Sequence, residues 1–326
     1  KIVNMNNTNG TCLPETSHVS ITALMSLVFF ISFILNIFSL WIFCCRMSTW
    51  STGTVLQFNL ALSDTLATPV TPLMAVYFAM GNEWIFGRFL CQVKIALLSS
   101  HFYGSTIFLT FISVHRYTAV VHFNKSSRMK NKDFIKKICA GVWLLLLALS
   151  LIYSFILPAT KEGEHRQCLN FSQKKLTNVY YAINFVLFTI GFLLPLSISA
   201  RCYLGVANML PHLNTSTPKG LKVKLKSQQM IRMCLFIFGI CFLPMNVIRT
   251  TGVILMKYYP QRCSMLQSIQ TAYYASWIFA GVNGCLDPVL YCFGSHSFRD
   301  ALGFLKMNQV ESPGRSASET TANQLE

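Results

Sequence analysis

Residues 20–45 read SITALMSLVFFISFILNIFSLWIFCC, a stretch that contains no Asp, Glu, Lys or Arg. A helix needs roughly 20 mostly apolar residues to cross the hydrocarbon core of a bilayer, so this stretch is long enough to span a membrane. Six further apolar stretches follow it, at about 54–80, 89–118, 137–158, 178–207, 230–256 and 265–293. The sequence therefore predicts an all-α protein, a bundle of seven transmembrane helices over residues 20–293.

The overall composition indicates the same fold. Hydrophobic residues make up 53% of the 326 residues and charged residues only 12%, and the mean hydropathy is +0.46. An ordinary soluble domain has about 25% charged residues, so the bilayer must solvate much of this chain. The net charge of +16 does not indicate nucleic-acid binding, because the excess lies largely in loops on one side, where it matches anionic lipid and fixes topology.

Basic residues also predict the orientation. Cytoplasmic loops carry an excess of Lys and Arg. The loop at 121–137 is rich in Lys and Arg, and the loop at 208–229 is rich in Lys. These loops therefore lie inside, which makes segment 1–19 extracellular and, with an odd number of spans, the C-terminus cytoplasmic. We expect a multi-pass protein of the plasma membrane. No cleavable signal peptide is visible, so the first span should act as its own insertion signal.

Sequons and cysteines agree with this orientation. The predicted exterior holds three glycosylation sequons, at Asn6, Asn9 and Asn170, although two further matches, at Asn124 and Asn214, fall on the predicted inside. The exterior is also oxidising enough to keep disulfides. Four cysteines lie there, and sequence alone allows three ways of pairing them: Cys12, Cys91, Cys168 and Cys263.

Two segments follow the seventh span. Residues 294–306 carry apolar side chains at helical spacing and should lie along the inner leaflet as a short amphipathic helix. Residues 307–326 are rich in Ser, Thr, Glu and Pro and should form a disordered cytoplasmic tail. Its hydroxyl groups are candidate phosphorylation sites: Ser312, Ser316, Ser318, Thr320 and Thr321.

Only two acidic residues fall inside the predicted spans, Asp64 and Asp287. A charge inside a membrane bundle costs a few kcal/mol, so each such residue is a functional hypothesis. Asn36, Ser105 and Asn283 add further oxygen groups in other parts of the spans. Together these residues could surround a sodium ion at Asp64, or waters, in the centre of the bundle. The alternative is a purely structural polar network.

These residues occur in an order that resembles the rhodopsin-like, class A family of G-protein-coupled receptors, over residues from about 12 to 306. The matching positions are Asn36, Asn59 to Asp64, Cys91, His115-Arg116-Tyr117, Trp143, Pro195, Tyr203, Cys241 to Pro244 and Asp287 to Tyr291. Within the family, the chain is similar to the purinergic nucleotide receptors and their lysophospholipid and carboxylate-sensing relatives. The strings that carry this second likeness are Trp84 to Gly87, Tyr103 to Thr110, His115 to Tyr117 and Cys285 to Tyr291, with the outer pair Cys12 and Cys263.

The resemblance implies a receptor whose agonist binds in the outer half and shifts a conformational equilibrium, which opens a cytoplasmic cleft for a heterotrimeric G protein. It implies that Arg116, Tyr117, Tyr203 and Tyr291 serve G-protein coupling. His115 stands where many members have an acid, so no acid–arginine lock is expected there. We further expect the disulfides to be Cys91–Cys168 and Cys12–Cys263.

Basic residues gather near the predicted outer face and favour a small anionic ligand. Arg249 and Asn246 lie three residues apart on one helical face, and the planar guanidinium donates in pairs to phosphate or carboxylate. This pair resembles the phosphate-binding pair of nucleotide receptors, while the aromatic stretch 273–277 also suits a lysophospholipid or a carboxylate. The candidate ligand-binding residues are Arg249, Asn246, Lys94, Tyr103, Tyr273 and Trp277.

Several alternatives remain open at this point. Arg249 could merely extend to the outer interface, and the chain could be an orphan or constitutively active receptor with another class of ligand. An enzyme is not expected, because neither H-E-x-x-H nor G-x-S-x-G occurs. A retinal-linked photoreceptor or pump is not expected, because residues 264–293 contain no lysine that could form the Schiff base. A transporter is not expected either, because the sequence shows no inverted repeat. No cofactor is expected apart from the sodium ion.

Overall fold

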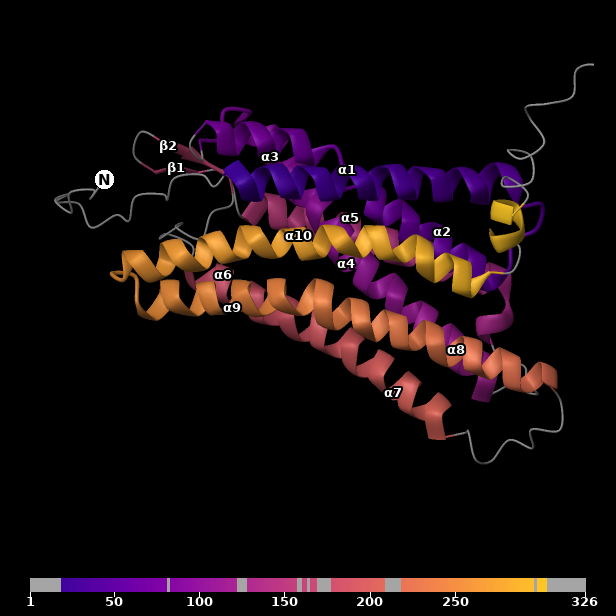
Figure 1. Cartoon of the computed structure of the whole chain (residues 1–326). Coiled ribbons are helices and arrows are strands. Elements are labelled where there is room, and N and C mark those ends of the chain that lie inside the picture. The colour runs from indigo at the N-terminus through magenta and orange to yellow at the C-terminus, as the bar shows by residue number, and fades with distance from the viewer. Residues whose placement is uncertain are drawn as a thin grey trace, which may run out of the picture.

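Helices dominate the computed structural model, which describes residues 19–80, 83–121, 128–156, 160–162, 165–168, 177–208, 218–295 and 298–303. Within these ranges the helices form seven rods that run along one another (Figure 1). The rods are α1 (Val19–Trp41); α2 (Thr52–Thr65) with α3 (Val70–Ala79); α4 (Gly87–Val121); α5 (Lys132–Ile156); α6 (Thr177–Phe188) with α7 (Leu194–Asn208); α8 (Pro218–Ile237) with α9 (Leu243–Tyr258); and α10 (Cys263–Gly294). The predicted all-α seven-helix bundle is confirmed.

Five rods are long and apolar enough to cross a membrane by length and composition: Val19–Arg46, Gly87–Val121, Lys132–Ile152, Asn178–Asn208 and Lys224–Tyr258. The second rod is divided into two short helices by a turn at residues 66–69, whose last residue, Pro69, precedes the first residue of α3. The last rod, α10, is 32 residues long but carries polar residues such as Asn283 and Asp287, whose exposed fraction is 0%. The second rod therefore differs from an uninterrupted apolar helix because of its turn, and the last rod because of its buried polar residues.

Prolines also shape the rods that are made of two helices. Proline has no backbone N–H, so it cannot donate to the carbonyl one turn earlier. Ahead of Pro195 the helix widens to a π-turn over Thr189–Leu193, in which Leu194 N donates to Thr189 O. Ahead of Pro244 the same happens over Phe238–Phe242, where Leu243 N donates to Phe238 O. Such π-turns are frequent at functional positions.

The outward faces of the rods are apolar. Large hydrophobic side chains are exposed along α1 and α5, including Phe30 at 58% and Leu144 at 68%. Polar side chains such as Asp64 and Asn36 are instead fully buried in the bundle. This distribution suits a lipid surround, where the solvent is apolar and polar groups must find partners inside.

The two ends of the bundle differ. The start of α1, the α9–α10 turn and a hairpin of β1 (Thr160–Glu162) and β2 (His165–Gln167) lie at one end (Figure 1). The end of α7, the start of α8 and the helical residues 298–303 lie at the other end (Figure 1). The hairpin pairs Thr160 with Gln167 in antiparallel register and was not predicted, because strands of three residues are too short to show an alternating pattern.

Candidate functional site

A cluster centred on Arg249 joins three of the predicted ligand-binding residues. Arg249 Nη1 on α9 donates to the Tyr103 hydroxyl oxygen on α4 at 2.9 Å. Arg249 Nη2 donates to Asn246 Oδ1 at 2.9 Å, and Asn246 Nδ2 in turn donates to Phe242 O at 2.9 Å. Because residues three apart on a helix share a face, α9 presents both side chains toward α4. The guanidinium is held in place by partners on two helices.

The Arg249 cation is buried without a compensating acid. Its exposed fraction is 9%, its Nε has no hydrogen-bond partner among the described residues, and no acidic side chain pairs with it in the part of the chain that the structure describes. The hydroxyl groups of Tyr103, Tyr273 and Tyr180 lie near it. A buried cation is costly unless it is paired with an anion, so the cluster has unused capacity to bind one.

Aromatic side chains of α10 stand beside this cluster. The rings of Tyr273 and Trp277 meet edge to face with centroids 5.6 Å apart. Trp277 also meets Phe102 of α4 edge to face at 6.0 Å. An amphipathic wall of this kind can pack against the apolar or aromatic part of a ligand while Arg249 binds its charge.

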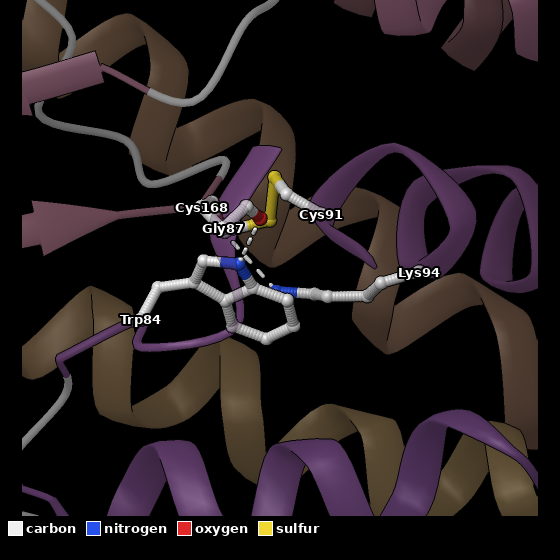
Figure 2. Close-up of a disulfide and its surroundings, with 5 residues drawn as sticks. All are labelled: Trp84, Gly87, Cys91, Lys94 and Cys168. Carbon is white, nitrogen blue, oxygen red and sulfur yellow. Dashed lines mark hydrogen bonds between the residues drawn. A yellow bond between two sulfur atoms is a disulfide. The ribbon is translucent and has the colours of Figure 1, made fainter. Parts of the chain in front are cut away.

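Lys94 occupies a separate environment, which Figure 2 shows. Its ammonium donates to Cys168 O at 3.3 Å and lies 5.0 Å from the centroid of the Trp84 ring and 5.5 Å from that of Tyr77. The Trp84 Nε1 group donates to Gly87 O at 2.8 Å, which fixes the indole (Figure 2). No hydrogen bond in the described ranges links Lys94 with Arg249. Lys94 therefore ties α4 to the segment that follows β2.

We predict that Lys94→Ala lowers the thermal stability of the receptor more than Lys257→Ala does. The first substitution removes a hydrogen bond worth about 1 kcal/mol and a buried cation–π contact worth about 0.5–2 kcal/mol. Lys257 is a matched control, since its ammonium lies over the Tyr181 ring at 3.9 Å but is more exposed. Thermal unfolding of the purified variants measures the difference, and equal melting temperatures would contradict the role assigned to Lys94.

The disulfide beside Lys94 was predicted correctly. Cys91 and Cys168 are bonded, which attaches the segment after β2 to the start of α4 (Figure 2). Cys263 is also disulfide-bonded. Its expected partner Cys12 lies outside the described residues, as do the glycosylation candidates Asn6, Asn9 and Asn170.

The predicted polar network is present in the centre of the bundle. Ser105 Oγ donates to Asp64 Oδ1 at 2.6 Å and Asn283 Nδ2 donates to the same oxygen at 3.2 Å. Asp287 is near enough for its carboxylate and that of Asp64 to repel each other. Asn36 instead donates to Gly284 O at 2.8 Å and to Ser32 O at 2.9 Å, so it joins α1 to α10 and does not bond to Asp64.

The chemistry of this network fits a sodium ion. Several buried oxygens have no hydrogen-bond partner among the residues described: Asp64 Oδ2, Asn283 Oδ1 and both carboxylate oxygens of Asp287. Hard cations prefer oxygen ligands of this kind, and a bound ion would offset the carboxylate charges. The candidate ligands are therefore the oxygens of Asp64, Asp287 and Asn283.

Sequence reasoning left one residue out of this network, His101. Its Nδ1 lies 3.4 Å from Asp64 Oδ1, and both side chains are buried. A lone histidine in an apolar stretch gives no sign of its partner, since the contact joins residues 37 positions apart on different helices. Only the register of α4 against α2 brings the two together.

The residues assigned to coupling lie near the C-terminal ends of α4, α7 and α10. Arg116 Nη2 donates to Gly294 O, the last residue of α10, at 2.6 Å. His115 Nε2 lies 2.8 Å from Thr52 Oγ1 on α2. Tyr117 and Tyr203 pack against a small core of Val120, Cys202, Val206 and Ile231. The Tyr291 ring packs against Phe43 and Phe298 at 5.4 and 5.8 Å.

Tyr291 and Tyr117 have different surroundings at this end of the bundle. The Tyr291 hydroxyl is buried and has no hydrogen-bond partner in the described part of the chain. Gly205 lets Tyr117 approach α7 closely, since a Cβ there would meet the Tyr117 ring. The side-chain hydrogen bond of Arg116 within the described ranges goes to the Gly294 carbonyl and not to Tyr291.

Comparison with known proteins gives the family. Residues 35–291 match the 7 transmembrane receptor (rhodopsin family). This chain belongs to that family. It is 35% identical to a purinoceptor of Mus musculus over 263 residues, which cover 79% of this chain and 69% of the relative. It is 30% identical to lysophosphatidic acid receptor 6 of Homo sapiens over 282 residues, which cover 86% and 81%.

Membership of this family fixes the broad function. The chain is a multi-pass membrane receptor of the purinergic-like cluster, and it couples an extracellular ligand to a G protein. Its relatives are receptors, not enzymes, and this chain is likewise no enzyme. The polar centre and the Arg249 cluster are therefore candidates for signal transmission and ligand recognition.

Proposed function

We propose that this receptor is activated by a small molecule whose phosphate or carboxylate binds Arg249. The observation that carries the proposal is a buried guanidinium with no acidic partner among the described residues. Arg249 is held by Tyr103 and Asn246, so its orientation is set before a ligand arrives. Such preorganisation lowers the entropy cost of binding.

The relatives support an anion as ligand. One is named a purinoceptor and another a lysophosphatidic acid receptor, and lysophosphatidic acid carries a phosphate. The Tyr273–Trp277 wall can accept either an aromatic ring or an acyl chain. The ligand class is therefore defined by its charge, and nucleotides, lysophospholipids and carboxylates all satisfy it.

The signal would pass inward through a population shift. Agonist at Arg249 contacts α9, which continues through the π-turn at Phe238–Phe242 into α8. A ligand favours the active state only by binding it more tightly than the inactive state. Arg116 would then leave Gly294 and repack with Tyr203 and Tyr291 against the G protein.

The orientation and the remaining partners belong to the same proposal. The N-terminal segment would be extracellular and the end that holds Arg116 would be cytoplasmic, because Lys and Arg are enriched in cytoplasmic loops. The basic segment 121–137 follows Arg116 closely in sequence. The Lys-rich segment 208–229 includes the end of α7 and the start of α8, which lie at the same end of the bundle as the end of α10 (Figure 1). The tail at 307–326 would recruit receptor kinases and arrestin after activation, and it lies outside the described residues.

A charge-matched agonist screen tests the proposal. Cells that express the receptor are exposed to nucleotides, lysophospholipids and small carboxylates, each beside its uncharged counterpart and beside cationic amines. We expect only anions to signal, with uncharged counterparts weaker by at least about 30-fold, since loss of a buried charge pair costs about 2 kcal/mol or more. A potent cationic agonist would contradict the proposed ligand class and leave the receptor family intact.

A further inference from the structure

The polar centre contains a histidine whose position is unusual for a cation site. His101 is fully buried on α4, and neither ring nitrogen has a hydrogen-bond partner among the residues that the structure describes. Its Nδ1 faces Asp64 Oδ1 at 3.4 Å. The imidazole therefore stands directly beside the carboxylate that was predicted to hold sodium.

Aromatic neighbours confine the imidazole to this position. The Phe29 ring of α1 meets it edge to face with centroids 6.0 Å apart, and the Phe102 ring lies 5.1 Å away. Phe29 is itself buried, with an exposed fraction of 4%. Close-packed interiors resist side-chain displacement, so the imidazole cannot easily withdraw from Asp64.

The two oxygens of the Asp64 carboxylate have different surroundings. Oδ1 faces Ser105 Oγ, Asn283 Nδ2 and His101 Nδ1 at 2.6, 3.2 and 3.4 Å. Oδ2 has no partner in the described ranges, and neither have the two oxygens of Asp287. A cation would need oxygen atoms on several sides. On the His101 side it meets a ring in place of an oxygen.

We propose that His101 sets the cation affinity of the Asp64–Asp287 site and keeps its affinity for sodium low. The imidazole occupies space next to Oδ1 that an ion and its waters would otherwise use, and it supplies no oxygen ligand. A shorter side chain with an amide oxygen at this position would free the space and add a ligand. The inference concerns the centre of the bundle and holds whichever ligand binds at Arg249.

The test measures thermal unfolding of the purified full-length receptor against NaCl, with choline chloride keeping the ionic strength constant. Because ligands that bind only the folded state stabilise it, the salt dependence reports sodium affinity without any signalling assay. We expect His101→Asn to lower the sodium concentration at half-maximal stabilisation by at least about tenfold relative to the unmodified receptor. His101→Ala frees space without adding an oxygen ligand, so it should also lower the sodium concentration at half-maximal stabilisation. This variant replaces His101→Asn in the test if His101→Asn folds poorly.

Asp64→Asn is the control for the site itself. Combined with His101→Asn, it should abolish the sodium dependence, since the carboxylate supplies the charge that binds the ion. The proposal is overturned if the unmodified receptor and both His101 variants show the same half-maximal sodium concentration. The proposal is equally overturned if sodium changes the thermal stability of none of these receptors. It is also overturned if sodium still stabilises the variant that combines His101→Asn with Asp64→Asn.

Discussion

Arg249→Ala is expected to reduce the potency of an anionic agonist by at least about 30-fold, because truncation of one partner in a buried charge pair costs about 2 kcal/mol or more. The Arg249 guanidinium is buried and has no acidic partner among the described residues. Its loss would leave the ligand anion desolvated and unpaired. Radioligand competition and concentration–response curves on equal amounts of surface receptor measure the effect.

Two matched variants separate charge from shape. Arg249→Lys keeps the charge but loses the planar fork, so potency should fall to an intermediate value. Tyr103→Phe removes only the oxygen that accepts from Arg249 Nη1, and loss of such a hydrogen bond costs about 1 kcal/mol, or about fivefold. If Arg249→Ala left every anionic agonist as potent as before, Arg249 would not be the ligand contact.

Arg116→Ala is expected to reduce agonist-stimulated coupling by at least about tenfold, equivalent to about 1.4 kcal/mol, while agonist affinity in the absence of G protein stays within about twofold. Arg116 lies near the C-terminal end of α4 and bonds to Gly294 O, the last residue of α10. This end of α10 lies at the opposite end of the bundle from the α9–α10 turn (Figure 1). Its loss removes the cation that would meet Tyr203, Tyr291 and the G protein. Second-messenger output and ligand binding are measured on the same membranes.

Arg128→Ala is the control for a general loss of positive charge. Arg128 is exposed in the short helix Arg128–Lys130, on the same predicted cytoplasmic side. Its removal should leave coupling nearly unchanged, because surface ion pairs contribute about 0–1 kcal/mol. Equal coupling by Arg116→Ala and the unmodified receptor would refute the role given to Arg116.

Much of the fold could be predicted because apolar length alone identifies a span. The first stretch, residues 20–45, became α1 and the π-turn that follows it. The division of the second rod near Pro69 was missed, since one proline in an apolar stretch kinks some helices and interrupts others. The β1–β2 hairpin was missed because its strands are held by pairing across a loop, which a pattern along the chain does not contain.

The site could be predicted only where its residues share one element or one family motif. Arg249 and Asn246 are three residues apart, so helical periodicity placed them together before the fold was known. The bond to Tyr103 and the contact of His101 with Asp64 depend on how α4 packs against other helices. Lys94 was placed at the outer end of its span, but the Trp84 ring and Cys168 O, which hold its ammonium, follow from tertiary packing.

The central claim to be tested is that ligand binding at the Arg249 cluster is transmitted through the bundle to a G protein. The most direct measurement is nucleotide exchange on a purified heterotrimeric G protein by the full-length receptor in lipid discs, with and without an anionic agonist from the screen. We predict that agonist raises the exchange rate at least about tenfold, and that Arg116→Ala binds the agonist but gives no such rise. An exchange rate that is the same with and without bound agonist would contradict the account.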